Sequence, residues 1–80
     1  MKKTLAELTE NDYVVDPWGN LHDVVKINDE TIDTYCYHVG KGNGSGQLII
    51  SDYPEFNTLP TEEAMVFIQE NIRKTIGFMQ

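Results

Sequence analysis

Alternation of apolar and polar positions predicts β-strands through the middle of the chain. The pattern is strongest over residues 31–39, where Ile32 and Cys36 alternate with Tyr35 and Tyr37 and β-branched residues are frequent. Short polar turns separate this segment from similar ones, and strands joined in this way usually pair antiparallel. We therefore predict a meander of three to four strands, over residues 13–15, 21–27, 31–39 and 47–53.

Helical periodicity replaces this alternation near the C-terminus. Thr61 is a good N-cap, and Glu62 and Glu63 follow in the first turn, where the helix dipole favours anions. The apolar residues beyond them share one stripe at helical spacing, namely Ala64, Met65, Ile68, Ile72, Ile76 and Met79. We predict a long helix whose stripe covers one face of the sheet, with Phe67 and Phe78 beside the stripe as candidates for a contact surface.

The N-terminal segment completes the predicted fold. Thr4 and Glu7 match a capping box, which predicts a short helix to about Thr9. The fold class is therefore α+β, with an antiparallel sheet of three to four strands, one long C-terminal helix and a short N-terminal helix. Residues 11–16 and 24–27 resemble the first hairpin of SH3-like barrels. That resemblance implies a small barrel with an appended helix as the alternative fold.

The length and composition indicate one small globular domain over residues 1–80. The chain has a mass of 9.1 kDa and is 40% hydrophobic, which is enough for one core and too little for two. Cys36 is the single cysteine, so an internal disulfide is excluded and a reducing compartment is favoured. The longest apolar run, residues 64–68, is too short to cross a membrane. We expect a soluble, cytoplasmic protein.

The charge of the chain argues against nucleic-acid binding. Thirteen acidic residues against six basic ones leave a formal charge of −7, whereas binding to the phosphate backbone requires clustered cations. The acidic residues concentrate in the N-terminal half, where Lys26 is the one basic residue between residues 4 and 40. This half is predicted to form an acidic face. Ordinary solubility would account for the same charge.

Residues 40–46 contain four of the six glycines and are predicted to be a loop. A phosphate-binding loop is not indicated, because a strand follows these glycines instead of a helix and the spacing of the Walker motif is absent. The segment is interpreted either as a mobile connector between strands or as a hairpin tip that inserts into a partner.

Four residues suggest reactive chemistry without making a recognisable motif. Cys36 and His38 share a strand face, and His22 and Asp23 could approach them from the neighbouring strand. One cysteine with two histidines falls short of the paired ligands of a structural zinc site, and a buried thiol is the usual state of a free cysteine. A cysteine nucleophile would also need a cleft and a lowered thiol pKa. We predict no metal, no cofactor and no enzymatic activity, and keep a Cys/His enzyme as the minor alternative.

Tyrosines on one face of the predicted sheet suggest a surface for another protein. Tyr35 and Tyr37 lie opposite Cys36 on the strand, and tyrosine is enriched at the centres of protein interfaces. In a basic protein these rings would suggest base stacking, which the charge of −7 opposes. The alternative is that both rings pack under the N-terminal segment.

Taken together, these features predict a small acidic binding protein that inhibits or regulates a basic, nucleic-acid-handling protein or nucleoprotein complex without binding nucleic acid itself. In size and charge the chain resembles compact inhibitors of phage and mobile-element origin, such as anti-CRISPR proteins, and its carboxylates could mimic phosphates. The alternative is an accessory or immunity-type module with an unrelated partner. The predicted contact residues are Asp16, Asp23, Asp29, Glu30, Asp33, Tyr35 and Tyr37.

Overall fold

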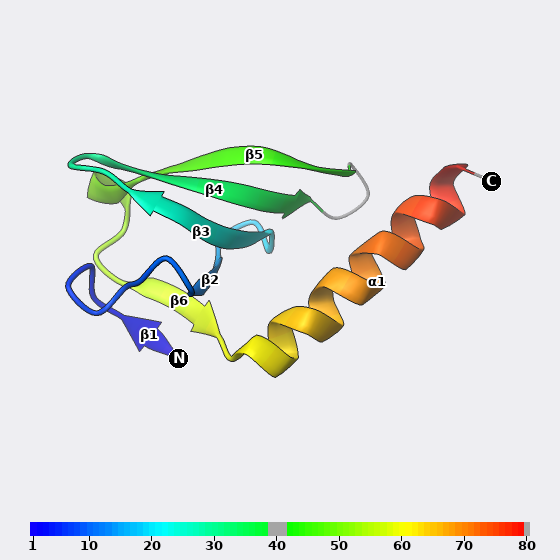
Figure 1. Ribbon diagram of the computed structural model, residues 1–80, viewed down its shortest axis with the longest axis horizontal. Coiled ribbons are helices and arrows are strands. Elements are labelled where there is room, and N and C mark those ends of the chain that lie inside the picture. Colours follow the sequence, from blue (N-terminus) through cyan, green and yellow to red (C-terminus); the bar gives the residue numbers. More distant parts are fainter. Residues whose placement is uncertain (39–41, 80) are drawn as a thin grey trace.

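The computed structural model describes residues 1–38 and 42–79, with side chains up to residue 73. Within these ranges, six strands form one antiparallel sheet and a single α-helix follows it (Figure 1). The strands are β1 (Lys2–Lys3), β2 (Tyr13–Val15), β3 (Leu21–Ile27), β4 (Thr31–His38), β5 (Gly42–Ile49) and β6 (Phe56–Leu59), and the helix is α1 (Thr61–Met79). The α+β class is confirmed, but the predicted three to four strands are too few.

The predicted meander is present in β2 to β5, which are neighbours in sequence order. The sheet then continues beyond the meander, because β6 returns to pair with β2 and β1 pairs with β6. The order of strands is β1-β6-β2-β3-β4-β5. Prolines at 54 and 60 flank β6, where Phe56 and Thr58 are buried and Asn57 between them is exposed, as in a half-buried strand.

The predicted N-terminal helix is absent, and turns take its place. The capping-box contact itself forms, since Glu7 Oε1 accepts hydrogen bonds from the Thr4 N–H and hydroxyl, both at 3.0 Å. Leu8 is the one residue of residues 4–9 that is buried, so a helix here would lack an apolar face to offset the cost of nucleation.

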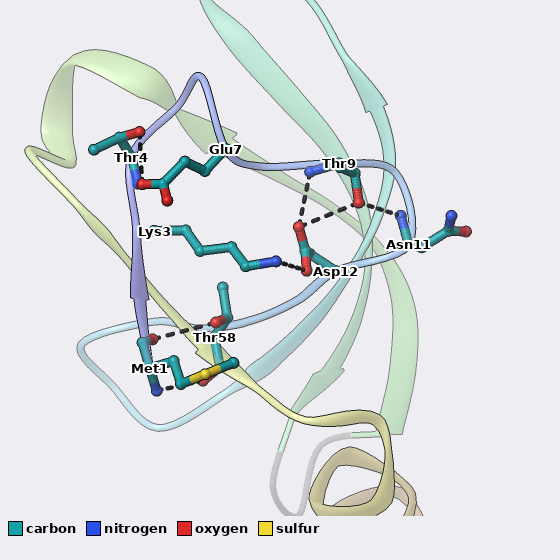
Figure 2. A network of polar contacts seen from close by, with 8 residues as sticks. All are labelled: Met1, Lys3, Thr4, Glu7, Thr9, Asn11, Asp12 and Thr58. Carbon is teal, nitrogen blue, oxygen red and sulfur yellow. Dashed lines mark hydrogen bonds and ion pairs between the residues drawn. The ribbon is translucent and has the colours of Figure 1, made fainter.

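Polar contacts hold the N-terminal segment to the sheet instead, as Figure 2 shows. Lys3 Nζ forms an ion pair with Asp12 at 2.7 Å, and the other carboxylate oxygen of Asp12 accepts the Thr9 N–H at 2.8 Å. The N–H of Thr58 donates to the Met1 carbonyl at 2.6 Å. The contact between Met1 and Thr58 brings β1 against β6, and the ion pair of Lys3 ties β1 to the segment before β2. The two residues of β1 alone do not predict a strand.

Most of the glycine-rich segment is strand and not loop. Residues 42–46 belong to β5, whose pairing with β4 runs from Thr31↔Ile49 to His38↔Gly42. Residues 40 and 41 lie outside the described residues. The Gly46 backbone passes so close to β4 that a Cβ there would lie 2.8 Å from Thr34 Oγ1 and 3.0 Å from Cys36 Cβ. Glycine is therefore required at position 46 by a close approach between strands, and not by a turn.

The strand predicted over residues 47–53 also ends earlier than expected. After Ile49 the chain forms a 3-10 turn over Ile50–Asp52, closed by the Tyr53 N–H on the Ile50 carbonyl at 3.0 Å. The side chain of Tyr53 then stacks on Phe56, with ring centroids 5.3 Å apart.

The hydrophobic core lies on one face of the sheet, which we call the core face. Its strand residues, Phe56 of β6 included, follow the two-residue period across neighbouring strands, and Leu8 packs on them from the N-terminal segment. The buried cluster consists of Leu8, Val14, Val24, Ile32, Leu48 and Phe56. The N-terminal segment therefore packs on the core face.

Helix α1 begins at Thr61, as predicted, but it does not cover a face of the sheet. It leaves the end of β6 and runs past the end of the β4–β5 hairpin (Figure 1). Ala64 and Asn71 are buried, whereas Ile72 is 45% exposed. At 100° per residue, Ile72 lies about 80° around the helix from Ala64. The contact line of α1 is thus rotated away from its apolar stripe, and the prediction that the whole stripe covers the sheet is wrong.

Candidate functional site

The face of the sheet opposite the core carries three tyrosines and an aspartate side by side. Tyr13 is the register partner of Asp23, and Asp23 is in turn the partner of Tyr35. Tyr37 follows on the same face of β4, beside Leu21. We call this surface the tyrosine face, defined by Tyr13, Asp23, Tyr35 and Tyr37.

The rings of the tyrosine face contact one another but are not enclosed. Tyr35 and Tyr37 meet edge to face, with ring centroids 5.2 Å apart and an interplanar angle of 69°. Tyr35 remains 41% exposed. The Tyr37 end of this face is buried: Leu21, a register partner of Tyr37, is 0% exposed, and Asn71 Nδ2 of α1 donates to the Oδ1 of Asn43, the other register partner of Tyr37, at 2.7 Å. The N-terminal segment does not cover the Tyr35 ring.

The surroundings of the tyrosine face disfavour negative charge on its own side chains. Burial raises the pKa of the Asp23 carboxyl above its usual range. Burial also raises the pKa of the Tyr37 hydroxyl, and the negative charge of Asp23 adds to that effect. Both shifts disfavour the charged forms. Among the described residues Asp23 forms no ion pair, whereas Asp33 on the same face has Lys26 as its register partner. A cation supplied from outside would find an uncompensated acceptor at Asp23.

Three further acidic residues gather where β3 turns into β4. Asp29 and Glu30 are exposed in the turn, and Asp33 follows on β4. Asp33 Oδ1 accepts a hydrogen bond of 3.4 Å from Gln47 Nε2, and its register partner is Lys26. We call Asp29, Glu30 and Asp33 the acidic tip. Asp33 shares a face with Tyr35, two positions along the strand, so the acidic tip continues the tyrosine face.

Asp16 lies apart from these residues and is buried beside the core face. Its Oδ1 accepts the backbone N–H groups of Trp18 and Asn20, both at 2.9 Å, and its Oδ2 accepts Asn20 Nδ2 at 3.2 Å. His22 Nε2 lies 2.9 Å from the same Oδ2. Burial alone would raise the pKa of the Asp16 carboxyl, but the hydrogen bonds from His22 and Asn20 outweigh it and lower that pKa.

His22 joins Asp16 to the sheet through a second hydrogen bond. Because the Asp16 carboxylate can only accept, the proton lies on Nε2, and in the neutral ring Nδ1 accepts from the Thr34 hydroxyl at 2.8 Å. The network holds the turn that follows β2. Gly19 completes that turn at φ +84°, and its N–H donates to the Asp16 carbonyl at 3.0 Å.

Cys36 contacts this network, but its surroundings do not activate its thiol as a nucleophile. Its Sγ lies 3.6 Å from His22 Nε2, the nitrogen whose proton Asp16 already accepts. A base for the thiol would need that nitrogen free. Burial and the negative charge of Asp16 raise the pKa of the Cys36 thiol to about 11. The side chain is 0% exposed. This arrangement favours a thiol that stays protonated and packed.

The four residues considered for zinc do not converge. His22 and Cys36 are register partners on the core side of the sheet, whereas Asp23 points to the tyrosine face. Within residues 1–38 and 42–79, no group of three or more histidine, cysteine or acidic side chains is arranged to hold a metal ion.

A groove beside the buried His22 is not predicted by any local pattern in the sequence. This open groove has a volume of about 720 Å³, and its floor includes His22 and Gly46. Trp18 stands at its rim and is 80% exposed, and Tyr53 lines it from the 3-10 turn. The one available signal was a solitary tryptophan in an Asp-Pro-Trp-Gly turn. Whether this tryptophan borders a groove depends on the pairing of β4 with the glycines of β5, and that pairing is not local in sequence.

Comparison with known protein families, with characterised proteins and with solved structures finds no match to this chain. Among the described residues, no helix has both the length and the apolar character needed to cross a membrane.

Proposed function

We propose that this protein is a small non-enzymatic binding protein that inhibits or regulates a basic partner that handles nucleic acid. One observation carries the proposal: tyrosines and the carboxylates of Asp23 and Asp33 lie on the same face of the sheet, where Tyr35 is 41% exposed. Asp23 is the cross-strand neighbour of Tyr35, and Asp33 lies two positions before Tyr35 on β4. Tyrosine supplies contact area at interface centres, and carboxylates select a basic surface.

The distribution of charge supports a partner rich in lysine and arginine. Glu7, Asp12 and Asp16 are engaged in contacts within the protein. The acidic tip is exposed or half-buried and carries three carboxylates near a single lysine, Lys26. The formal charge of −7 extends this field over the molecule. Such a surface attracts basic proteins and repels nucleic acid.

Mimicry of a nucleic-acid backbone is part of the proposal, and the clustered negative charge of the acidic tip supports it. Inhibitors of phage or mobile-element type act on basic enzymes in the cytoplasm, and this is the setting we propose. In this proposal Asp16 stabilises the turn after β2 and does not contact the partner.

An accessory subunit or immunity-type module is the second candidate. Its support is the exposed Tyr35, because an aromatic patch can bind a partner of any charge. We also retain the small SH3-like barrel as the finer proposal for the fold. In its favour, β6 follows a 3-10 turn and returns to the first strand of the meander.

The test compares binding of the wild type and of the triple variant Asp29→Asn, Glu30→Gln, Asp33→Asn. Immobilised protein would be incubated with nuclease-treated cell extract, retained proteins identified by mass spectrometry, and the dissociation constant of the purified partner measured over a range of salt. We expect a basic, nucleic-acid-handling partner, affinity at least about tenfold weaker in the triple variant, and a flatter salt dependence.

The matched control is the double variant Glu62→Gln, Glu63→Gln, which changes exposed carboxylates at the start of α1. It should leave the affinity unchanged. If the triple variant binds with the same affinity and the same salt slope as the wild type, the acidic proposal is overturned. Loss of binding in Tyr35→Ala alone would then favour the accessory module.

A further inference from the structure

The two edge strands of the sheet differ in length and in composition. At one edge, β1 has two residues, both lysines, and short charged edge strands are a common protection against further pairing. At the other edge, β5 has eight residues, Gly42–Ile49, with no charge and no proline. In the described part of the chain, β4 is its one hydrogen-bonded neighbour strand. The outer side of β5 thus has the composition of a strand that is free to pair.

The register identifies which backbone groups point outward from β5. The N–H of Ile50 donates to the Glu30 carbonyl at 3.0 Å, and the β4–β5 pairing continues in that register. In an antiparallel ladder, hydrogen-bonded and non-hydrogen-bonded pairs alternate. Gly44, Gly46 and Leu48 therefore bond to β4. The N–H and C=O groups of Ser45, Gln47 and Ile49 point away from the sheet.

Two hollows flank this edge, and both include Gln47 and Ile49. The first is the groove of about 720 Å³ on the core side, with Trp18 at its rim. The second has a volume of about 530 Å³ and is lined by Asp29 and Glu30 of the acidic tip. No lysine or arginine lines either hollow among the described residues.

We infer that the outer edge of β5 is a strand-addition site for an extended segment of the basic partner. Successive side chains of an added strand point to opposite faces, which matches one hollow on each side of the edge. The side chain on the core side would be apolar or aromatic and would pack against Trp18. The next would be a lysine or arginine and would pair with Asp29 and Glu30. The identity of the occupant rests on the proposed function, because the proposal requires a basic partner.

A second copy of this chain could in principle use the same edge. Both copies would carry a charge of −7, which opposes their association, and the β5 of the second copy carries no basic side chain for the acidic hollow. The charge of the second hollow therefore favours a basic segment over self-pairing.

The test uses a synthetic probe, an acetylated and amidated octapeptide of alternating valine and arginine, with a valine–glutamate peptide as its control. Amide hydrogen exchange of the full-length protein would be followed by NMR. We expect the Ser45, Gln47 and Ile49 amides to exchange rapidly in the free protein and at least about tenfold more slowly with the arginine peptide. The Gly44, Gly46 and Leu48 amides should be slow in both states.

Backbone methylation of the probe separates strand addition from simple charge attraction. One peptide would be N-methylated at its valines and the other at its arginines. In an added strand only one of these sets of N–H groups faces β5, so one peptide should bind and the other should not. Equal binding of both peptides would overturn the inference.

A protein variant provides the complementary test. Ser45→Pro removes an outward N–H and no bond to β4, whereas Ser45→Thr keeps that N–H. We expect Ser45→Pro to abolish peptide binding and Ser45→Thr to preserve it; should Ser45→Pro fail to fold, the methylated peptides decide. If the purified partner binds with salt dependence but the three outward amides stay unprotected, the inference fails while the proposed function stands. Protection that depends on protein concentration without any peptide would indicate self-pairing and would also overturn it.

Discussion

On the core side of the sheet, the Asp16 carboxylate is buried and receives four hydrogen-bond donors, whereas on the tyrosine face Asp23 is half-buried beside rings. The pKa of Asp16 is lowered and that of Asp23 is raised. Two aspartates seven positions apart thus differ: the surroundings of Asp16 stabilise its anion, and those of Asp23 destabilise its anion. The contrast shows which face is complete by itself and which face would gain from an external cation.

The aromatic side chains compared on the two faces also differ in burial, with the more buried one on the core face. Phe56 is almost fully buried in the core and stacked on Tyr53, while Tyr35 is 41% exposed and contacts one ring, Tyr37, edge to face. The buried hydrophobic cluster that contains Phe56 thus lies on the core face. The tyrosine face retains area that can be buried later, in a complex.

The largest expected effect comes from truncating a core aromatic residue. Phe56→Ala should lower the free energy of unfolding by about 3–5 kcal/mol, through lost burial and the cavity that remains. Tyr35→Ala should cost less than about 1 kcal/mol, because much of that ring is already in water. Urea titration followed by circular dichroism would measure both. Equal losses would show that the tyrosine face is a second core.

The fold was predictable from sequence where the pattern was local. Alternation located β3 and β4, and Thr61 marked the start of α1. The strands β1 and β6 were missed because their pairing joins chain segments more than fifty residues apart, as in Lys2↔Asn57. The apolar stripe also predicts that α1 is amphipathic, but it does not predict which side of the helix contacts the sheet. Asn71, a polar residue, lies on the contact side.

The candidate site was predictable only in part for the same reason. Strand alternation placed Tyr35 and Tyr37 together, and the turn composition exposed Asp29 and Glu30. The position of Asp16 was not predictable, since its burial depends on His22 and on the turn between them. The strand at residues 42–46 was missed because glycine has a low intrinsic preference for strands. These residues form a strand because their backbone pairs with β4.

An intermediate effect is expected for Asp16→Asn. The amide nitrogen would meet His22 Nε2 and Asn20 Nδ2, so one of these groups would lose its acceptor, at a cost of about 1–3 kcal/mol near neutral pH. The folded pKa of Asp16 lies below the unfolded one. The stabilisation by its carboxylate is therefore full above the ordinary aspartate pKa and is lost as pH falls through the lowered folded pKa.

The measurement for this variant is urea unfolding at a series of pH values from neutral to acid. The difference between wild type and Asp16→Asn should shrink as the pH falls below the ordinary aspartate range. Glu10→Gln changes the net charge equally at an exposed position and is the control. A difference that stays constant with pH would mean that the Asp16 carboxylate adds nothing as an anion.

The smallest effect, and one of opposite sign, is expected for Asp23→Asn. The folded pKa of Asp23 is raised by burial, so ionisation disfavours the folded state above that pKa and has no effect below the unfolded pKa, where both states are protonated. Asp23→Asn should therefore be slightly more stable than the wild type near neutral pH, and the gain should vanish in acid. If the acidic proposal holds, the same substitution should weaken binding of the basic partner, because the cation that Asp23 lacks is supplied by that partner. A variant that gains stability and keeps full affinity would exclude Asp23 from the contact and leave the acidic tip to carry recognition.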